Sequence, residues 1–111
     1  MTALVLGYYP DVNASTRVGL RPLHLASMAG FTDICSQLVN LGAEVEARDS
    51  DGLTALRVAV QAGELEVVKM LIERGARTDT IGVKDGHSLI EIAVISGHES
   101  IIHYLEKQTT L

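Results

Sequence analysis

The chain contains few aromatic residues and a single cysteine, and these scarcities exclude several classes of protein. Among its 111 residues there are no tryptophans, one phenylalanine and one cysteine. A single cysteine can form neither an internal disulfide framework nor a thiolate zinc cluster. Aromatics make up only 4% of the residues while small aliphatic side chains dominate, and this composition favours closely stacked helices over a sandwich or barrel.

Basic residues and long apolar runs are scarce as well. Lys and Arg number 9 against 14 Asp and Glu, a formal net charge of −5, so a nucleic-acid partner is not expected because phosphate binding needs a basic surface. No apolar run approaches the roughly 18 residues of a membrane span, and no membrane association is predicted. The apolar opening Met1 to Tyr9 lacks a basic leader and a cleavage pattern, which favours an intracellular protein. With 47% hydrophobic residues, the chain should fold. Its length of 111 residues suits one domain or one piece of a repeat array.

The sequence repeats itself. Placing Gly19 over Gly52 gives a shift of 33 residues, and placing Gly52 over Gly86 gives a shift of 34. At these shifts residues of similar type fall into the same columns: Leu23, Leu56 and Ile90; Ala26, Ala59 and Ala93; Gly30, Gly63 and Gly97; Ile34, Val67 and Ile101; Leu38, Leu71 and Leu105. Agreement of both type and spacing at so many positions indicates a real repeat.

The residue pattern of each repeat unit predicts two short helices followed by an extended connection. Proline suits a first helical turn and glycine a helix end, so a first helix is predicted from Pro22 to Ala29, ended by Gly30. A second helix is predicted over about Asp33 to Leu41, with Thr32 and Asp33 as its caps. An extended segment from Glu44 to Leu53 then leads to the next unit.

The start of each unit resembles the signature of the ankyrin-repeat family, Gly-x-Thr-Pro-Leu-His-x-Ala. It occurs as Gly19-Leu20-Arg21-Pro22-Leu23-His24-Leu25-Ala26, as Gly52-Leu53-Thr54-Ala55-Leu56-Arg57-Val58-Ala59, and in its most eroded form as Gly86-His87-Ser88-Leu89-Ile90-Glu91-Ile92-Ala93. The resemblance implies an all-α solenoid of stacked helix-turn-helix units with projecting turns or hairpin loops. It divides the single domain 1–111 into a partial repeat over 1–18, a repeat over 19–51, a repeat over 52–85 with a one-residue insertion, and a capping repeat over 86–111.

Departures from the family pattern lead to further predictions. His24, Arg57 and Glu91 occupy equivalent positions, and we expect Arg57 and Glu91 to approach each other and partly replace missing signature hydrogen bonds. Glu106 replaces the apolar Ile72 of the preceding unit, as suits the last face of a stack. At the other end no polar cap is visible, and apolar surface could be exposed at Leu4, Val5, Leu6 and Tyr8.

No pattern in the sequence favours catalysis or metal binding. Cys35 falls on the buried face of a helix and is expected to be a small core residue rather than a reactive thiol. His24 and His98 fit structural positions of the family, and His98 and His103 are five residues apart, on different faces of a helix. The acidic stretch Asp49-Ser50-Asp51-Gly52 lacks the later ligands of a calcium loop and predicts a solvated turn. We therefore predict no metal, no cofactor and no enzymatic activity.

The resemblance implies a non-enzymatic module, such as an adaptor or scaffold, that binds a protein or peptide through its concave helix face and turn tips. Carried over residue by residue, the family's contact positions are Arg17, Val18, Leu20, Met28, Arg48, Ser50, Asp51, Leu53, Gln61, Lys84, Asp85, His87 and Ile95. Apolar residues at several of these positions predict a mixed groove that could accept a helix or an extended peptide. A second interpretation, in which these side chains pack onto neighbouring turns, stays open.

Two other functions also stay open. The chain could be a structural or self-associating subunit, or a fragment of a longer array, that docks through its apolar N-terminal end and so forms a homo-oligomer. A small-molecule or catalytic pocket could form at the irregular loop from Thr78 to Asp85, although no convergent set of ionisable residues is found there.

Overall fold

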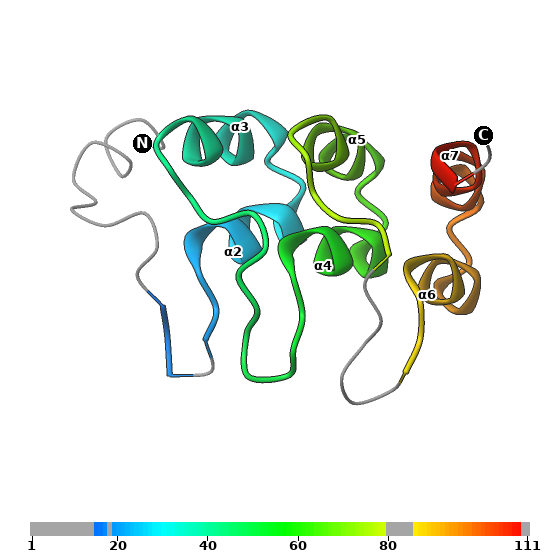
Figure 1. The fold of residues 1–111 in the computed structure, drawn as a ribbon, viewed down its shortest axis with the longest axis horizontal. Helices are drawn as coiled ribbons and strands as arrows, with labels where there is room; N and C mark the ends of the chain where they lie inside the picture. Colours follow the sequence, from blue (N-terminus) through cyan, green and yellow to red (C-terminus); the bar gives the residue numbers. More distant parts are fainter. Residues whose placement is uncertain (1–14, 18, 80–85, 110–111) are drawn as a thin grey trace.

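The helices of the chain stack in successive pairs (Figure 1). The computed structural model describes residues 15–17, 19–79 and 86–109. The pairs are α2 (Pro22–Ala29) with α3 (Thr32–Asn40), α4 (Ala55–Ala62) with α5 (Leu65–Glu73), and α6 (Leu89–Ser96) with α7 (Glu99–Thr109). Helices α2, α4 and α6 form one layer, α3, α5 and α7 form the other, and each helix packs on its counterpart in the next pair. The predicted all-α stack of helix-turn-helix units is confirmed. In the part of the chain described, no helix is long and apolar enough to cross a membrane.

The first helix of each pair begins and ends at local signals in the sequence. Helix α2 covers the predicted range, with its proline in the first turn. Thr54 caps α4 by accepting a hydrogen bond from the Arg57 N–H at 3.3 Å. At α6 the capping is reciprocal, because Ser88 Oγ accepts from the Glu91 N–H at 3.2 Å while Glu91 Oε1 accepts from the Ser88 N–H at 2.8 Å. All three helices end at a glycine whose φ lies between 75 and 81°.

The second helix of the first pair starts earlier than the sequence predicted. It spans Thr32–Asn40 rather than Asp33 to Leu41, and its N-cap is Phe31, which makes no side-chain capping bond. The predicted capping by Thr32 and Asp33 is therefore wrong. The turn at Gly30 is so tight that the Phe31 N–H already donates to the Ala26 carbonyl at 3.0 Å, and the chain becomes helical at the next residue.

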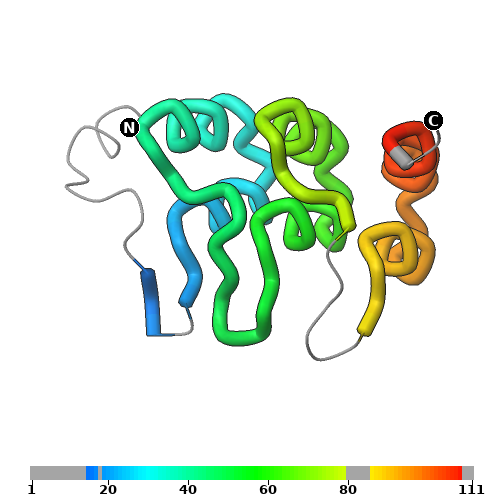
Figure 2. Tube along the Cα trace, in the orientation of Figure 1, coloured from blue at the N-terminus to red at the C-terminus, as the bar shows by residue number. Residues whose placement is uncertain are grey.

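The connection between the first two pairs contains the predicted acidic turn. Asp49 Oδ1 accepts from the N–H groups of Asp51 and Leu53, both at 2.9 Å, and the Gly52 N–H donates to the Asp49 carbonyl at 2.9 Å. Aspartate is favoured at such turns because its side chain can bond the backbone that follows it. The segment is not extended throughout, since a hydrogen bond of 3.3 Å from the Ala47 N–H to the Glu44 carbonyl adds a second turn. The connection projects beyond the layer of first helices as a loop (Figure 2).

Small aliphatic side chains fill the space between the layers. Leu38, Leu71 and Leu105, which form one column of the repeat, are at most 1% exposed. Burying a leucine side chain fully stabilises a fold by about 1.5–3 kcal/mol, so this column makes a large contribution. Cys35 is completely buried, its Sγ lies 3.6 Å from Ser27 Oγ, and burial raises the pKa of its thiol. Its prediction as a core residue is confirmed.

Candidate functional site

Two buried side chains tie helices of the first layer to the turn of the next pair. His24 Nδ1 accepts from the Arg21 N–H at 3.1 Å, so its Nε2 carries the proton and donates to the Leu53 carbonyl at 2.8 Å. Arg57 occupies the equivalent position in α4, and its Nη1 donates to the His87 carbonyl at 2.8 Å. Both side chains are almost completely buried. They hold the turns that carry Leu53 and His87 against the stack, in agreement with the structural role predicted for His24.

The bond from Arg57 to the turn was not predicted from the sequence. The signal was available, because Arg57 is a hydrogen-bond donor in the same column as the signature histidine His24. Glu91, the third member of the column, is bonded to the Ser88 N–H, and its Oε2 lies 3.9 Å from His87 Nδ1. The approach of Arg57 to Glu91 stays a prediction.

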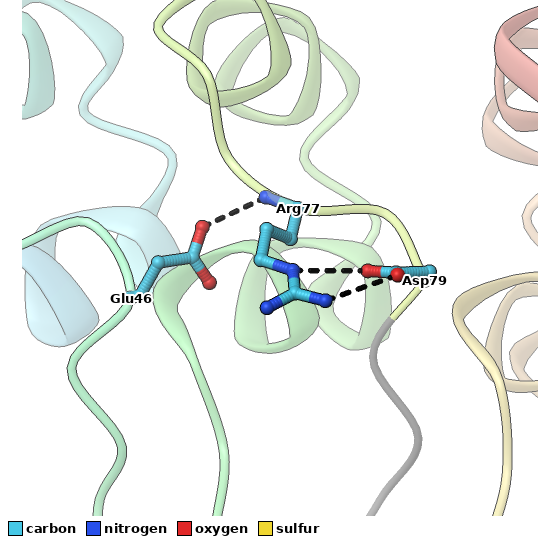
Figure 3. Close-up of polar contacts among 3 residues, drawn as sticks. All are labelled: Glu46, Arg77 and Asp79. Carbon is cyan, nitrogen blue, oxygen red and sulfur yellow. Dashed lines mark hydrogen bonds and ion pairs between the residues drawn. The ribbon is translucent and has the colours of Figure 1, made fainter.

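A second set of contacts connects the segments that follow α3 and α5. Glu46 Oε2 accepts from the Arg77 N–H at 2.7 Å, and the Arg77 guanidinium bonds both carboxylate oxygens of Asp79 at 3.2 and 3.1 Å (Figure 3). The hydrogen bonds and charge of Arg77 lower the pKa of Asp79, and Asp79 in turn raises the pKa of Arg77. Because both side chains are largely exposed, water screens this pair and its contribution to stability is small. The contacts orient the chain just before residues 80–85. These residues, which make up most of the predicted Thr78 to Asp85 loop, lie outside the described residues.

Three predicted contact residues occupy the same place on successive first helices. Met28, Gln61 and Ile95 are the penultimate residues of α2, α4 and α6, and all three are exposed. The exposed fraction is 47% for Met28 and 66% for Ile95. Since α2, α4 and α6 lie side by side in one layer (Figure 1), these residues form a row across it, which we call the helix-end row.

The predicted contact residues on the turns are mainly polar at the surface. Arg17, Arg48, Ser50 and Asp51 are exposed, whereas Leu20, Leu53 and His87 are half-buried. Arg48 Nη1 donates to the Gly52 carbonyl at 3.0 Å and so supports its own turn. The leucines of the turns are thus partly covered, and the exposed apolar side chains of the predicted groove are those of the helix-end row. The remaining predicted contacts, Val18, Lys84 and Asp85, lie outside the described residues.

The helical pairs, the glycine ends and the bonded turns all repeat at the period of the sequence. Residues 1–82 match the family model described as ankyrin repeats in three copies. The chain belongs to the ankyrin-repeat family. The resemblance of the motifs is thereby confirmed, and membership implies protein–protein interaction. The match ends before α6 and α7, where the signature is most eroded, yet these helices pack on α4 and α5 as the earlier ankyrin pairs pack on each other.

Two curated proteins are similar to part of this ankyrin-repeat chain. Over 49 residues it is 37% identical to protein phosphatase 1 regulatory subunit 27 of Homo sapiens and of Mus musculus. The aligned segment covers 44% of this chain and 32% of each relative. The chain therefore spans about a third of the length of these curated relatives.

Two exposed apolar side chains, one in α2 and one in α6, were not predicted from the sequence. Leu25 in α2 is 47% exposed, although its counterpart Val58 in α4 is only 5% exposed. Val94 in α6 is 57% exposed, although its counterpart Val60 is completely buried. For Val94 the signal was positional, because α6 packs on α4 and no described helix follows α6 in this layer.

His98 contacts the end of the preceding first helix. His98 Nε2 donates to the Gln61 carbonyl at 3.2 Å, and its ring lies against Gly63 at the end of α4. Across the described ranges, no three His, Cys, Asp or Glu side chains are grouped so that they could hold a metal ion. His98 therefore ties the third pair to the second.

Proposed function

We propose that this chain is a non-enzymatic protein-binding module, an adaptor or scaffold that binds a protein or peptide through the helix-end row and the adjoining turns. The observation that supports it most directly is the exposure of Met28 and Ile95 at equivalent positions of α2 and α6. An apolar centre with a polar rim is the usual anatomy of a binding surface, and here the polar turn residues Arg48, Ser50 and Asp51 supply the rim. Because both side chains are already partly covered, covering the remainder would contribute about 1–2 kcal/mol each.

The first partner to test is the catalytic subunit of protein phosphatase 1. The human and mouse relatives are both named protein phosphatase 1 regulatory subunit 27. A regulatory subunit acts through binding rather than through catalysis of its own, which is consistent with a module that carries no catalytic constellation in its motifs. The proposal extends this partner class to the present chain.

The test compares binding by the native chain and by a variant altered in the helix-end row. Purified phosphatase catalytic subunit is titrated against immobilised native chain and against the double variant Met28→Glu, Ile95→Glu. The matched control places the same two carboxylates on the other layer, as Gln37→Glu and Ser100→Glu, where both side chains are exposed. We expect the helix-end variant to bind at least about tenfold more weakly, and the control to bind like the native chain.

The outcomes separate the partner from the surface. Equal binding by the native chain and the folded helix-end variant would refute the proposed surface. If the phosphatase does not bind, affinity capture from lysate with the same three proteins still tests the module. A protein retained by the native chain and the control but lost by the helix-end variant would then support the surface and refute the phosphatase as its partner.

Self-association is a second candidate function, favoured by the first helix pair. Leu25 and Phe31 are 47% and 55% exposed, and an open hollow of about 550 Å³ is lined by Phe31, Ile34 and neighbouring residues of α3. The exposed apolar side chains of this pair could receive a second copy through the N-terminal end. The N-terminal residues Leu4, Val5, Leu6 and Tyr8 of this prediction lie outside the described residues. A mass that rises with concentration in sedimentation, and that Leu25→Glu restores to the monomer, would support this function; a monomer at every concentration would refute it.

A further inference from the structure

The last helix pair keeps the aliphatic side chains that the preceding pair buries when it stacks. We define the terminal face as Ile90 and Val94 of α6 and Ile102 of α7. The counterparts of these residues one unit earlier are at most 1% exposed: Leu56, Val60 and Val68. On the terminal face, Val94 is 57% exposed and the two isoleucines are half-buried. The surface that would meet a next helix is therefore still apolar, and no described residue covers Val94.

The hydrogen-bonding residue beside the terminal face differs from those at the internal junctions. At the internal junctions, the residue in the column of the signature histidine is a donor. His24 donates to the Leu53 carbonyl and Arg57 donates to the His87 carbonyl, each at 2.8 Å. The third column residue is Glu91, whose carboxylate can only accept when ionised. A further unit stacked in the same way would present its turn carbonyl to this carboxylate, and two acceptors cannot bond each other. The face is therefore not matched to another unit of the same kind.

Among the described residues, two carboxylates flank the terminal face. The Glu91 side chain is 57% exposed, as is that of Glu106, which replaces the partly buried Ile72 of the preceding unit. Each has a histidine beside it, His87 Nδ1 at 3.9 Å from Glu91 and His103 Nδ1 at 3.7 Å from Glu106. The nearest lysine along α7, Lys107, corresponds to the exposed Glu73 and so lies toward solvent rather than on this face. An apolar centre flanked by carboxylates complements a surface that is apolar and basic.

We propose that the terminal face binds an amphipathic helix of a partner protein, whose aliphatic side chains cover Ile90 and Val94 and whose arginine or lysine reaches Glu91. A helix is the matching element because the same face of α2 is covered by α4, and that of α4 by α6. A basic side chain is the matching charge because it donates to the carboxylate that replaces the internal donors. This surface shares no residue with the helix-end row, and neither proposal depends on the other.

The test uses a displayed library of helical peptides selected on the native chain. We expect the enriched sequences to combine aliphatic residues at i, i+3 or i+4, and i+7 with an arginine or lysine beside them. An enriched peptide is then synthesised and its affinity measured by fluorescence anisotropy. Val94→Glu should weaken binding at least about tenfold, and Glu91→Gln, which keeps an oxygen for the Ser88 N–H, should weaken it by a similar factor at low salt.

A charge reversal makes the test specific. The variant Glu91→Arg should reject the enriched peptide and accept the same peptide with its basic residue replaced by glutamate. Met28→Glu, in the first helix pair, is the control for the helix-end row and should leave the affinity unchanged. Circular dichroism confirms that each variant is folded before binding is measured.

The proposal is overturned by several results. These are an absence of enrichment, enriched sequences without a basic residue, or an affinity that Val94→Glu and Glu91→Gln leave unchanged. Loss of binding in Met28→Glu alone would assign the peptides to the helix-end row, which would refute this proposal and support the proposed function. Dimerisation of the native chain that Val94→Glu abolishes would identify a second copy as the occupant instead of a partner helix.

Discussion

Gly63 and Gly97 offer a controlled measurement of how successive ankyrin pairs contact each other. Each ends a first helix in the left-handed region, with φ of 81° and 75°. A Cβ added to Gly63 would lie 2.7 Å from Cε1 of His98, whereas a Cβ added to Gly97 meets no described atom within 4 Å. Substitution by alanine therefore imposes the same backbone cost at both sites but a steric cost at only one.

The expected losses follow from these two terms. A left-handed residue with a Cβ costs about 1–2 kcal/mol, and both variants carry this cost. At Gly63 the new methyl group must also displace the His98 ring, and the 3.2 Å bond from Nε2 to the Gln61 carbonyl is lost with it. That bond is worth about 0.5–1.5 kcal/mol, and the ring can turn toward solvent without moving the backbone. Gly63→Ala should thus lower the free energy of unfolding by about 1 kcal/mol more than Gly97→Ala does.

Urea unfolding followed by far-UV circular dichroism measures both losses. The same two substitutions are repeated in a His98→Ala background, where the ring and its hydrogen bond are already gone. There the costs of Gly63→Ala and Gly97→Ala should become equal. Equal costs in the native background, or a difference that persists without His98, would refute the reasoning.

Three other predictions test the core and the junctions. Arg57→Ala should lower the free energy of unfolding by about 1–3 kcal/mol, because it removes the buried donor to the His87 carbonyl; simply additive losses in a double-mutant cycle with Glu91→Ala would contradict the predicted approach of the two side chains. Val60→Ala should cost about 1–2 kcal/mol more than Val94→Ala in urea unfolding, because only Val60 is fully buried; equal unfolding midpoints would count against the stacking. The Cys35 thiol, fully buried and with a raised pKa, should react with a disulfide reagent only when urea unfolds the chain, and rapid labelling of the native protein would disprove its burial.

Local residue patterns were sufficient to predict much of the helical structure. The bounds of α2 follow from Pro22 and Gly30, because a helix start and a helix end each depend on a few neighbouring residues. The turn at Asp49 was equally predictable, since an aspartate side chain bonds backbone that lies within a few residues. The start of α3 was not, because it depends on how tightly the turn at Gly30 returns the chain to the Ala26 carbonyl.

The candidate surface was predictable only in part. Met28 and Ile95 are exposed, in agreement with their predicted place, whereas the turn residues Leu20 and Leu53 are half-buried. How far the turn leucine Leu53 is covered depends on the preceding pair, because the bond from His24 to the Leu53 carbonyl draws that turn against α2. Sequence spacing assigns a residue to a turn but does not say how closely the turn packs.

The sequence by itself determined the repeat, the approximate positions of its helices and the family to which the chain belongs, since these depend on residue type and spacing. Only the tertiary structure decided which members of each repeated column are covered. Val60 and Val94 are both valines in the same column, yet Val60 is completely buried and Val94 is 57% exposed. The physical reason is that burial in a stack requires a neighbouring helix, and α6 lies over α4 whereas no described helix lies over α6.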